Sequence, residues 1–357
     1  MSCPPTYLSY RRAPGPTPSS PLTLIRTTEP FPNVSSLSPH EVLLKIHAVS
    51  LNYRDVAIQN GTYPLPVKPK GIPVSDAAAE VVAVGGSVTR FAKGDKVTVI
   101  VDLKNITGRE DDGYATPGVD YDGLLREYAV FHEEVLVKLP GQLGWEEGAT
   151  LACVGVTAWR ALGLHLSGTK EIQGTGGVSI FTLILALAAG FEPIITSSSD
   201  TKLENLINSF PDRVGKINGY NYRTFPKQVA KVKELTNGKG VNIVVNNVGT
   251  ASILDDLESL VVRDGVVSLV GYLDGLKAGW HHAELAIQLI KKAANLRGIF
   301  CGSRDDLQDL SDYLEEKNVR LRELVDKVFE FEQAKEAFVY LESGKHVGKV
   351  LIKVSSD

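Results

Sequence analysis

A glycine-rich loop precedes the longest nearly unbroken apolar run of the chain and is suited to bind phosphate. Three glycines lie within residues 173–179, and the apolar run 180–189 begins directly after them. Glycines let the backbone turn tightly and approach a pyrophosphate, and the N-terminus of the following helix favours negative charge. A glycine turn before a core helix is the alternative, because Ser179 stands where G-x-G-x-x-G needs its third glycine. The residues expected to hold the pyrophosphate of a dinucleotide are Gly174, Thr175, Gly176, Gly177 and Val178.

The cysteines and histidines offer no metal pattern. The three cysteines, Cys3, Cys153 and Cys301, are far apart, which gives neither a disulfide framework nor a C-x-x-C site. Apolar neighbours make Cys153 a small buried hydrophobe rather than a nucleophile. The histidines form no His-x-x-x-His or His/Cys cluster, so no metal is expected.

Composition and charge favour a protein that binds small molecules, and the lack of a secretion signal or a membrane span favours the cytoplasm. The chain has 357 residues, enough for two domains, and a net charge of −4 with its basic residues spread along the sequence. No nucleic-acid partner and no membrane surface are therefore expected. The apolar run 180–189 is about half of the roughly 20 residues that span a bilayer. The first 20 residues lack the apolar segment of a secretion signal.

The elements that must position the glycine loop change character near residue 150. The preceding part is rich in β-type segments separated by turns, as in antiparallel sheets. From residue 149 onward, strand patterns alternate with helix patterns, which predicts a doubly wound parallel sheet, and thus an α/β fold class. A final strand is expected at 348–354. The strands expected in the alternating part are 193–199, 242–248, 265–270 and 298–301.

Several motifs occur together in the order found in a known family. They are Ser-Leu-Asn-Tyr-Arg-Asp at 50–55, Gly-Thr-Tyr-Pro at 61–64, Ile-Pro-Val-Ser-Asp at 72–76, Asp-Gly-Leu-Leu-Arg-Glu-Tyr at 122–128, Gly-Ala-Thr-Leu-Ala-Cys at 148–153 and the glycine loop. Jointly the chain resembles the medium-chain dehydrogenase/reductase superfamily, in its zinc-free quinone-oxidoreductase-like or zinc-type alcohol dehydrogenase-like branch. The resemblance implies a GroES-like β-rich catalytic domain at 1–150 and 303–357 and a Rossmann domain at 151–302. It also implies an active site in the cleft between the domains and suggests a homodimer.

The resemblance also bears on zinc and on the reaction. The family positions of the catalytic zinc ligands hold Asn52, Ser75 and Cys153, and 103–123 contains no cysteine for a structural zinc. Without a Lewis acid, hydride addition to a conjugated C=C bond fits best, because an enone or quinone spreads the developing charge onto its oxygen. Tyr63 is the first candidate for proton donor, with Asn52 and Tyr53 as further catalytic candidates. Reduction of a carbonyl or oxidation of an alcohol with NADP is the alternative.

Cofactor choice depends on the end of the second Rossmann strand. An acid there selects NAD, whereas this strand ends in serines with a lysine following, which favours NADPH. The expected contacts to the 2′-phosphate are Ser197, Ser198, Lys202 and Tyr222. Family positions further along imply cofactor contacts from Asn247, Gly249, Gly271, Tyr272, Phe300, Cys301, Gly302 and Lys349.

The segment before the glycine loop departs from the family pattern. It is short and carries Lys170 and Glu171 where a central parallel strand is normally apolar throughout. The first Rossmann strand is therefore expected to be truncated or shifted. This departure leaves a rival open, in which the nucleotide site is eroded and the chain is a cofactor-independent catalyst or a binding protein.

Overall fold

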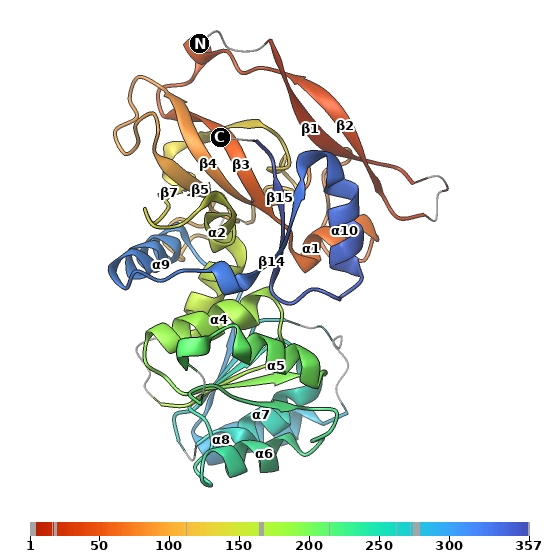
Figure 1. Ribbon diagram of the computed structural model, residues 1–357, viewed down its shortest axis with the longest axis vertical. Helices are drawn as coiled ribbons and strands as arrows, with labels where there is room; N and C mark the ends of the chain where they lie inside the picture. Colours follow the sequence, from red (N-terminus) through yellow and green to blue (C-terminus); the bar gives the residue numbers. More distant parts are fainter. Residues whose placement is uncertain are drawn as a thin grey trace. The chain divides into compact units, whose positions relative to one another are not determined.

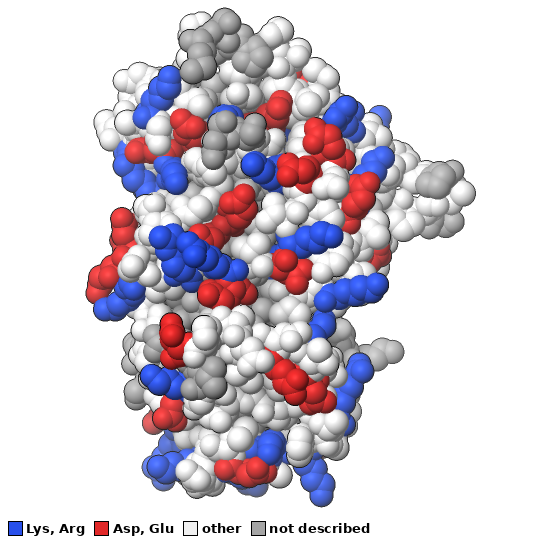
Figure 2. All heavy atoms as spheres, viewed as in Figure 1, with Lys and Arg blue, Asp and Glu red and all other residues white. Residues whose placement is uncertain are grey.

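The computed structural model divides the chain into two compact units. It describes residues 5–15, 17, 20–111, 113–163, 168–213, 215–261, 263–271, 273 and 279–355. Unit 1 comprises residues 1–156 and 302–357, and unit 2 comprises residues 157–301. Within the described ranges, no helix is both long enough and apolar enough to cross a membrane. Figure 2 shows acidic and basic side chains interspersed over the described residues of the face in view.

Unit 1 is built on a seven-stranded sheet in the order β14-β15-β3-β4-β5-β7, with β6 paired to β3. A separate antiparallel pair is formed by β1 and β2. The strands are β1 (Thr6–Ala13), β2 (Thr23–Pro30), β3 (Glu41–Ser50), β4 (Asp76–Val84), β5 (Lys96–Val99), β6 (Tyr128–His132), β7 (Leu136–Lys138), β14 (Val325–Glu330) and β15 (Lys349–Lys353). The helices are α1 (Tyr53–Gln59), α2 (Trp145–Gly148), α9 (Arg304–Glu316) and α10 (Ala334–Glu342), with a π-helical turn at Leu151–Gly155.

The two longest strands of this sheet, β3 and β4, have side chains buried on both faces over most of their length. Small residues of β4, at positions 77–79, are fully buried and allow close packing against β3. The last strand returns to the first sheet, where β15 pairs antiparallel with β3 and Leu351 lies opposite Ser50 (Figure 1). Residues near the C-terminus therefore complete a sheet that begins near residue 41.

Unit 2 contains a six-stranded parallel sheet in the order β10-β9-β8-β11-β12-β13. Numbered along the chain, this is the 3-2-1-4-5-6 order of dinucleotide-binding domains. The strands are β8 (Lys170–Ile172), β9 (Pro193–Ser197), β10 (Asn218–Asn221), β11 (Ile243–Asn246), β12 (Val266–Leu269) and β13 (Asn295–Gly298). The helices are α3 (Val156–Leu162), which begins at the unit boundary, α4 (Gly177–Ala188), α5 (Asp200–Asn208), α6 (Gln228–Leu235), α7 (Ile253–Ser259) and α8 (His282–Lys292).

Helices cover both faces of the parallel sheet. In Figure 1, α4 and α5 lie on one side of it, and α6, α7 and α8 lie on the other. Right-handed crossovers produce this arrangement, because the strand order runs outward from β8 in one direction and then reverses. The predicted α/β fold class, with a β-rich GroES-like part and a doubly wound Rossmann part, is confirmed.

Two details of the sequence-based assignment were wrong. The strand expected at 298–301 lies at Asn295–Gly298, because α8 ends at Lys292 and Ala293 turns the chain with a φ of 45°. Strand β10 was not predicted, since its sequence Asn-Gly-Tyr-Asn has the composition of a turn. It forms because it pairs with β9, which a local pattern cannot show.

The first Rossmann strand is present but truncated. Lys170 and Glu171 of β8 are both fully buried, and β8 pairs with β9 on one side and β11 on the other. The Nζ atom of Lys170 lies 4.5 Å from the ring centroid of Phe191, and burial lowers the pKa of Lys170 to about 8. The strand thus remains central although two of its three residues are ionisable.

Candidate functional site

The glycine loop lies at the point where the strand order of unit 2 reverses. In the sheet, β8 lies between β9 and β11, and the glycine loop follows its carboxyl end. Doubly wound sheets bind their ligands at this place. Asn247 follows β11 and donates from Nδ2 to the carbonyl oxygen of Gln173 at 3.0 Å. The hydroxyl of Ser179 donates to the same oxygen at 2.7 Å. Two side chains therefore fix the start of the loop.

The loop and the helix that follows it fit a phosphate group. Gly174 has a φ of +83°, which L-residues with a side chain rarely adopt, so glycine is needed for the turn. A Cβ atom added to Gly176 would meet no atom within 4 Å, so the backbone at the start of α4 faces open space. The first turn of α4, all of which the structure describes, contains no acidic side chain that would repel an anion. The backbone at Gly174 and Gly176 is thus suited to a phosphate, and the cofactor roles of Thr175, Gly177 and Val178 stay predictions.

The end of β9 brings together two of the residues expected near a 2′-phosphate. The backbone N–H of Tyr222 donates to the carbonyl oxygen of Ser197 at 3.0 Å, and the Tyr222 side chain is 45% exposed. Ser198 follows β9, and Ser199 begins α5 by accepting from the backbone N–H of Lys202 at 3.3 Å. The nearby carboxylate of Asp200 accepts from Asn221 Nδ2 at 3.0 Å.

The remaining predicted cofactor residues follow the strands on the other side of the sheet. Gly249 has a φ of +116° and donates from its backbone N–H to Asn246 Oδ1 at 2.7 Å. A Cβ atom on Gly271 would lie 2.7 Å from the carbonyl oxygen of Asn247, so the two backbones approach closely there. Phe300 is 50% exposed. Cys301 ends unit 2, Gly302 begins the second segment of unit 1, and Tyr272 lies outside the described residues.

A buried network of carboxyl groups and amides lies beneath the glycine loop. The carboxyl group of Asp256 accepts from Gln173 Nε2 at 2.6 Å and from Asn246 Nδ2 at 2.5 Å. The hydroxyl of Tyr220 donates to Glu171 Oε1 at 2.8 Å, whereas Glu171 Oε2 is buried without a described partner. Burial raises the pKa of Asp256 to about 7 and, together with the charge of Asp256, raises the pKa of Glu171 to about 8.

This network was not predicted from the sequence. Asp256 lies on α7 and Tyr220 on β10, and no sequence spacing relates these residues to Glu171. The cost of burying Glu171 was the one available signal, because such a group must be paired or neutralised. The amide of Gln173, the residue before Gly174, connects the carboxyl group of Asp256 to the start of the loop.

Unit 1 holds a second buried polar cluster, which contains the candidate Asn52. The Oδ1 atom of Asn52 accepts from the ammonium of Lys349 at 2.8 Å, and its Nδ2 atom donates to Asp76 Oδ2 at 2.8 Å. Lys349 also donates to the carbonyl oxygen of Leu51. The carboxylate of Asp55 accepts from the backbone N–H of Asn52 at 2.8 Å. Burial raises the pKa of Asp76 to about 6, raises that of Asp55 and lowers that of Lys349.

The two tyrosine candidates lie at the ends of α1, next to this cluster in sequence. Tyr53 is the first residue of the helix and is 62% exposed, whereas Tyr63 lies four residues after Gln59, the last residue of the helix, and is half-buried. The structure places Lys349, which was predicted to contact cofactor, inside the cluster, where its ammonium is bonded to the Leu51 and Asn52 oxygens. Asp76 was missed, although an acid directly before a run of small apolar residues in a strand is unusual.

Two of the three residues at the family's zinc positions, Asn52 and Ser75, are engaged with other groups. The hydroxyl of Ser75 accepts from the guanidinium of Arg54 and lies 3.4 Å from Asp76 Oδ1. Asn52 is held by Lys349, whose positive charge opposes a second cation beside it. Across the described parts of the chain, no three His, Cys, Asp or Glu side chains are grouped as metal ligands are. The donor set therefore fits Zn²⁺ poorly.

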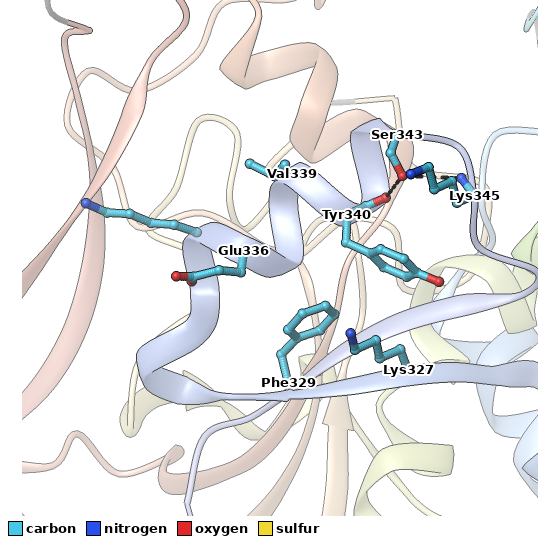
Figure 3. A pocket seen from close by; sticks show the side chains of 8 residues that line it. Lys327, Phe329, Glu336, Val339, Tyr340, Ser343 and Lys345 are labelled. Atoms are coloured by element: carbon cyan, nitrogen blue, oxygen red, sulfur yellow. Dashed lines mark hydrogen bonds between the residues drawn. The ribbon is translucent and has the colours of Figure 1, made fainter.

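A shallow groove on unit 1 contains none of the predicted site residues. It has a volume of about 550 Å³ and lies over α10 and β14 (Figure 3). The Nζ atom of Lys327 lies 4.5 Å from the ring centroid of Phe329 and 5.2 Å from that of Tyr340, and the Tyr340 hydroxyl donates to Asp326. The ammonium of Lys327 thus already interacts with two aromatic rings, and we assign this groove no role in the site.

Comparisons with known proteins agree with this architecture. The family model for the alcohol dehydrogenase GroES-like domain matches residues 38–141, and that for zinc-binding dehydrogenases matches residues 218–352. A zinc-type alcohol dehydrogenase-like protein of Schizosaccharomyces pombe is 38% identical over 330 residues, covering 89% of this chain and 92% of the relative. A quinone oxidoreductase of Pseudomonas aeruginosa is 27% identical over 332 residues, covering 88% and 91%.

A solved structure shows the same fold over the whole chain. The crystal structure of a putative alcohol dehydrogenase from Sinorhizobium meliloti 1021 has a TM-score of 0.87 and 30% identity, and it covers 99% of this chain and 100% of that chain. The sequence relatives and the shared fold both include the β-rich and the parallel-sheet parts. The chain therefore belongs to the medium-chain dehydrogenase/reductase superfamily, whose members related to it include quinone oxidoreductases and zinc-type alcohol dehydrogenase-like proteins.

Proposed function

We propose that the protein is a zinc-independent, NADPH-dependent oxidoreductase that reduces a conjugated C=C bond. The observation that carries the proposal is the glycine loop at the strand-order reversal of unit 2. Its positive-φ turn, its open space at Gly176 and the N-terminus of α4 together suit a pyrophosphate. When bound, the nicotinamide supplies the hydride.

The end of β9 supports NADPH over NADH. This strand ends in Ser197 without the acidic residue that would accept hydrogen bonds from a ribose 2′-hydroxyl. Tyr222, held beside Ser197, and Lys202 on α5 offer a hydroxyl and an ammonium for a phosphate instead. Asp200 is the opposing charge nearby, and its hydrogen bond from Asn221 gives it an alternative partner.

The cluster in unit 1 supports a reaction without zinc. The family's metal positions carry an amide, a hydroxyl and a single thiol, and the buried Lys349 already places an ammonium beside the amide. Stabilisation of the developing oxygen charge is then assigned to hydrogen-bond donors, with the Asn52 amide as the donor to the substrate oxygen. Tyr63 is assigned as the donor of the proton that reaches the α-carbon after hydride addition at the β-carbon.

Two experiments test this proposal in sequence. Titration of the protein with NADPH, followed by tryptophan fluorescence, is expected to saturate, whereas absence of binding up to millimolar concentration would support the eroded-site rival. Incubation with deuterated NADPH and a panel of enones, quinones and ketones is expected to place deuterium on the β-carbon. Deuterium on a carbinol carbon would reject C=C reduction and indicate an alcohol or carbonyl oxidoreductase.

A further inference from the structure

Lys349 is placed opposite Asn52 by the register of two strands. Strand β15 pairs antiparallel with β3, and Leu351 lies opposite Ser50. The backbone N–H of Leu51 continues the ladder by donating to the carbonyl oxygen of Val350 at 2.9 Å. The next pair along this register is Lys349 and Asn52. The lysine is 3% exposed, so its ammonium is held inside unit 1.

The hydrogen bonds around Asn52 permit only one orientation of its amide. An ammonium can only donate, so the atom that faces Lys349 at 2.8 Å must be the amide oxygen. The amide nitrogen then faces Asp76, whose carboxylate accepts at 2.8 Å. Reversing the amide would place two donors together on one side and two acceptors together on the other.

We infer that Lys349 is a positioning residue, which holds and polarises the Asn52 amide so that its free N–H can bind the substrate oxygen. This inference rests on the proposed function and assigns Lys349 no contact with the cofactor. The Asn52 nitrogen carries two N–H groups, and Asp76 is its one acceptor among the described residues. Because the oxygen of the same amide bonds to a cation, its N–H groups become stronger donors.

The rest of the cluster holds the buried lysine in place. The ammonium also donates to the Leu51 carbonyl oxygen, and burial lowers the pKa of Lys349 although the charges of Asp76 and Asp55 oppose this shift. Asp55 fixes the backbone of Asn52 at the start of α1 through its bond to the Asn52 N–H. Asn52 itself is buried, with 7% of its surface exposed.

The first test needs no cofactor. In the apo protein labelled with ¹⁵N-asparagine, the side-chain signals of Asn52 are assigned by their loss in Asn52→Ala. Lys349→Met is expected to shift these signals and speed their proton exchange, whereas Lys353→Met, a matched change on the same strand, leaves them unchanged. Unchanged Asn52 signals in Lys349→Met overturn the inference even if the protein proves to have no reductase activity. If Lys349→Met does not fold, Lys349→Gln is used in its place. Glutamine keeps an N–H donor, so a smaller shift of the Asn52 signals is expected.

The second test separates positioning from cofactor binding. Lys349→Met is expected to lower kcat by about tenfold to a hundredfold and to change the Kd for NADPH by less than about twofold. In the Asn52→Ala background, Lys349→Met is expected to have no further effect on kcat, because the amide through which Lys349 acts is absent. A raised Kd with unchanged kcat makes Lys349 a cofactor ligand, and a full additional loss of kcat in the double variant shows an independent role. Either result overturns the inference.

Discussion

Replacing Glu171 by glutamine is expected to remove much of the pH dependence of the stability of unit 2. Glu171 is fully buried in β8, and one of its oxygens accepts from Tyr220 while the other has no described partner. Burial raises the pKa of this carboxyl group from its ordinary value of 4.5 to about 8. Glutamine has nearly the same shape, keeps an oxygen for the Tyr220 hydroxyl and cannot ionise.

The sign and the size of the effect follow from proton linkage. Between pH 4.5 and about 8, the folded protein keeps the Glu171 proton that the unfolded chain has lost. The free energy of unfolding of the wild-type protein therefore falls as pH rises through this window, by about 1.4 kcal/mol for each pH unit. Over the whole window the loss amounts to about 4 to 5 kcal/mol. The advantage of Glu171→Gln over the wild type should grow with pH by the same amount.

Differential scanning calorimetry of both proteins between about pH 5.5 and pH 8.5 measures this growth. From pH 5.5 to about pH 8 the growth is about 3.5 kcal/mol, which for a unit of this size corresponds to a rise of roughly 10 °C in the Tm difference. Comparing the two proteins at each pH cancels the titration of groups that do not sense Glu171, whereas Asp256, whose titration is coupled to Glu171, contributes to the measured difference. Glu192→Gln, on an exposed glutamate of the same unit, should follow the wild type at every pH. A Tm difference between Glu171→Gln and wild type that stays constant with pH would refute the reasoning.

Four further predictions concern the proposed reaction. Gly176→Asp places a carboxylate in the open space before α4 and is expected to raise the Kd for NADPH at least about tenfold. Gly176→Ala, whose Cβ meets no atom within 4 Å, is expected to change this Kd little. Fluorescence titration measures the Kd of both variants. Tyr63→Phe is expected to lower kcat by about a hundredfold or more with little change in KM, and Tyr121→Phe, on an exposed tyrosine of the same unit, serves as its control in steady-state assays. Lys202→Ala should weaken NADPH about tenfold and leave NADH unaffected, and comparable losses for both cofactors in parallel titrations would argue against a 2′-phosphate contact. Dialysis against a chelator should leave kcat within about twofold of its starting value, and a loss restored by Zn²⁺ would contradict zinc independence.

The layout of the fold was predictable because it depends on local patterns. Alternating strands and helices after residue 149 predicted the doubly wound sheet, and the loop 173–179 marked the end of its first strand. Its glycines were informative because a backbone turn with positive φ constrains residue type directly, as at Gly174. The strand β10 was missed because three of its four residues are Asn or Gly, which are rare in strands, and it forms by pairing with β9.

The polar clusters were not predictable, because their members meet only in the folded chain. Lys349 and Asn52 lie almost 300 positions apart and become neighbours through the register of β15 on β3. Glu171 was recognised as costly to bury, but Tyr220, whose hydroxyl donates to it, comes from an element whose packing no pattern reveals. Sequence reasoning identified which groups needed compensation and not which groups would provide it.

The discontinuity of unit 1 sets the order in which the protein can form during synthesis. Residues 157–301 constitute unit 2 and emerge from the ribosome as one continuous segment, so they can fold as soon as they are released. Residues 48–50 of β3 pair with β15, which is made only after all of unit 2, whereas β4 and β6 belong to the first segment of unit 1. Until β15 is made, the end of β3 lacks one backbone partner, and an unpaired strand edge of this kind favours mispairing in a nascent chain.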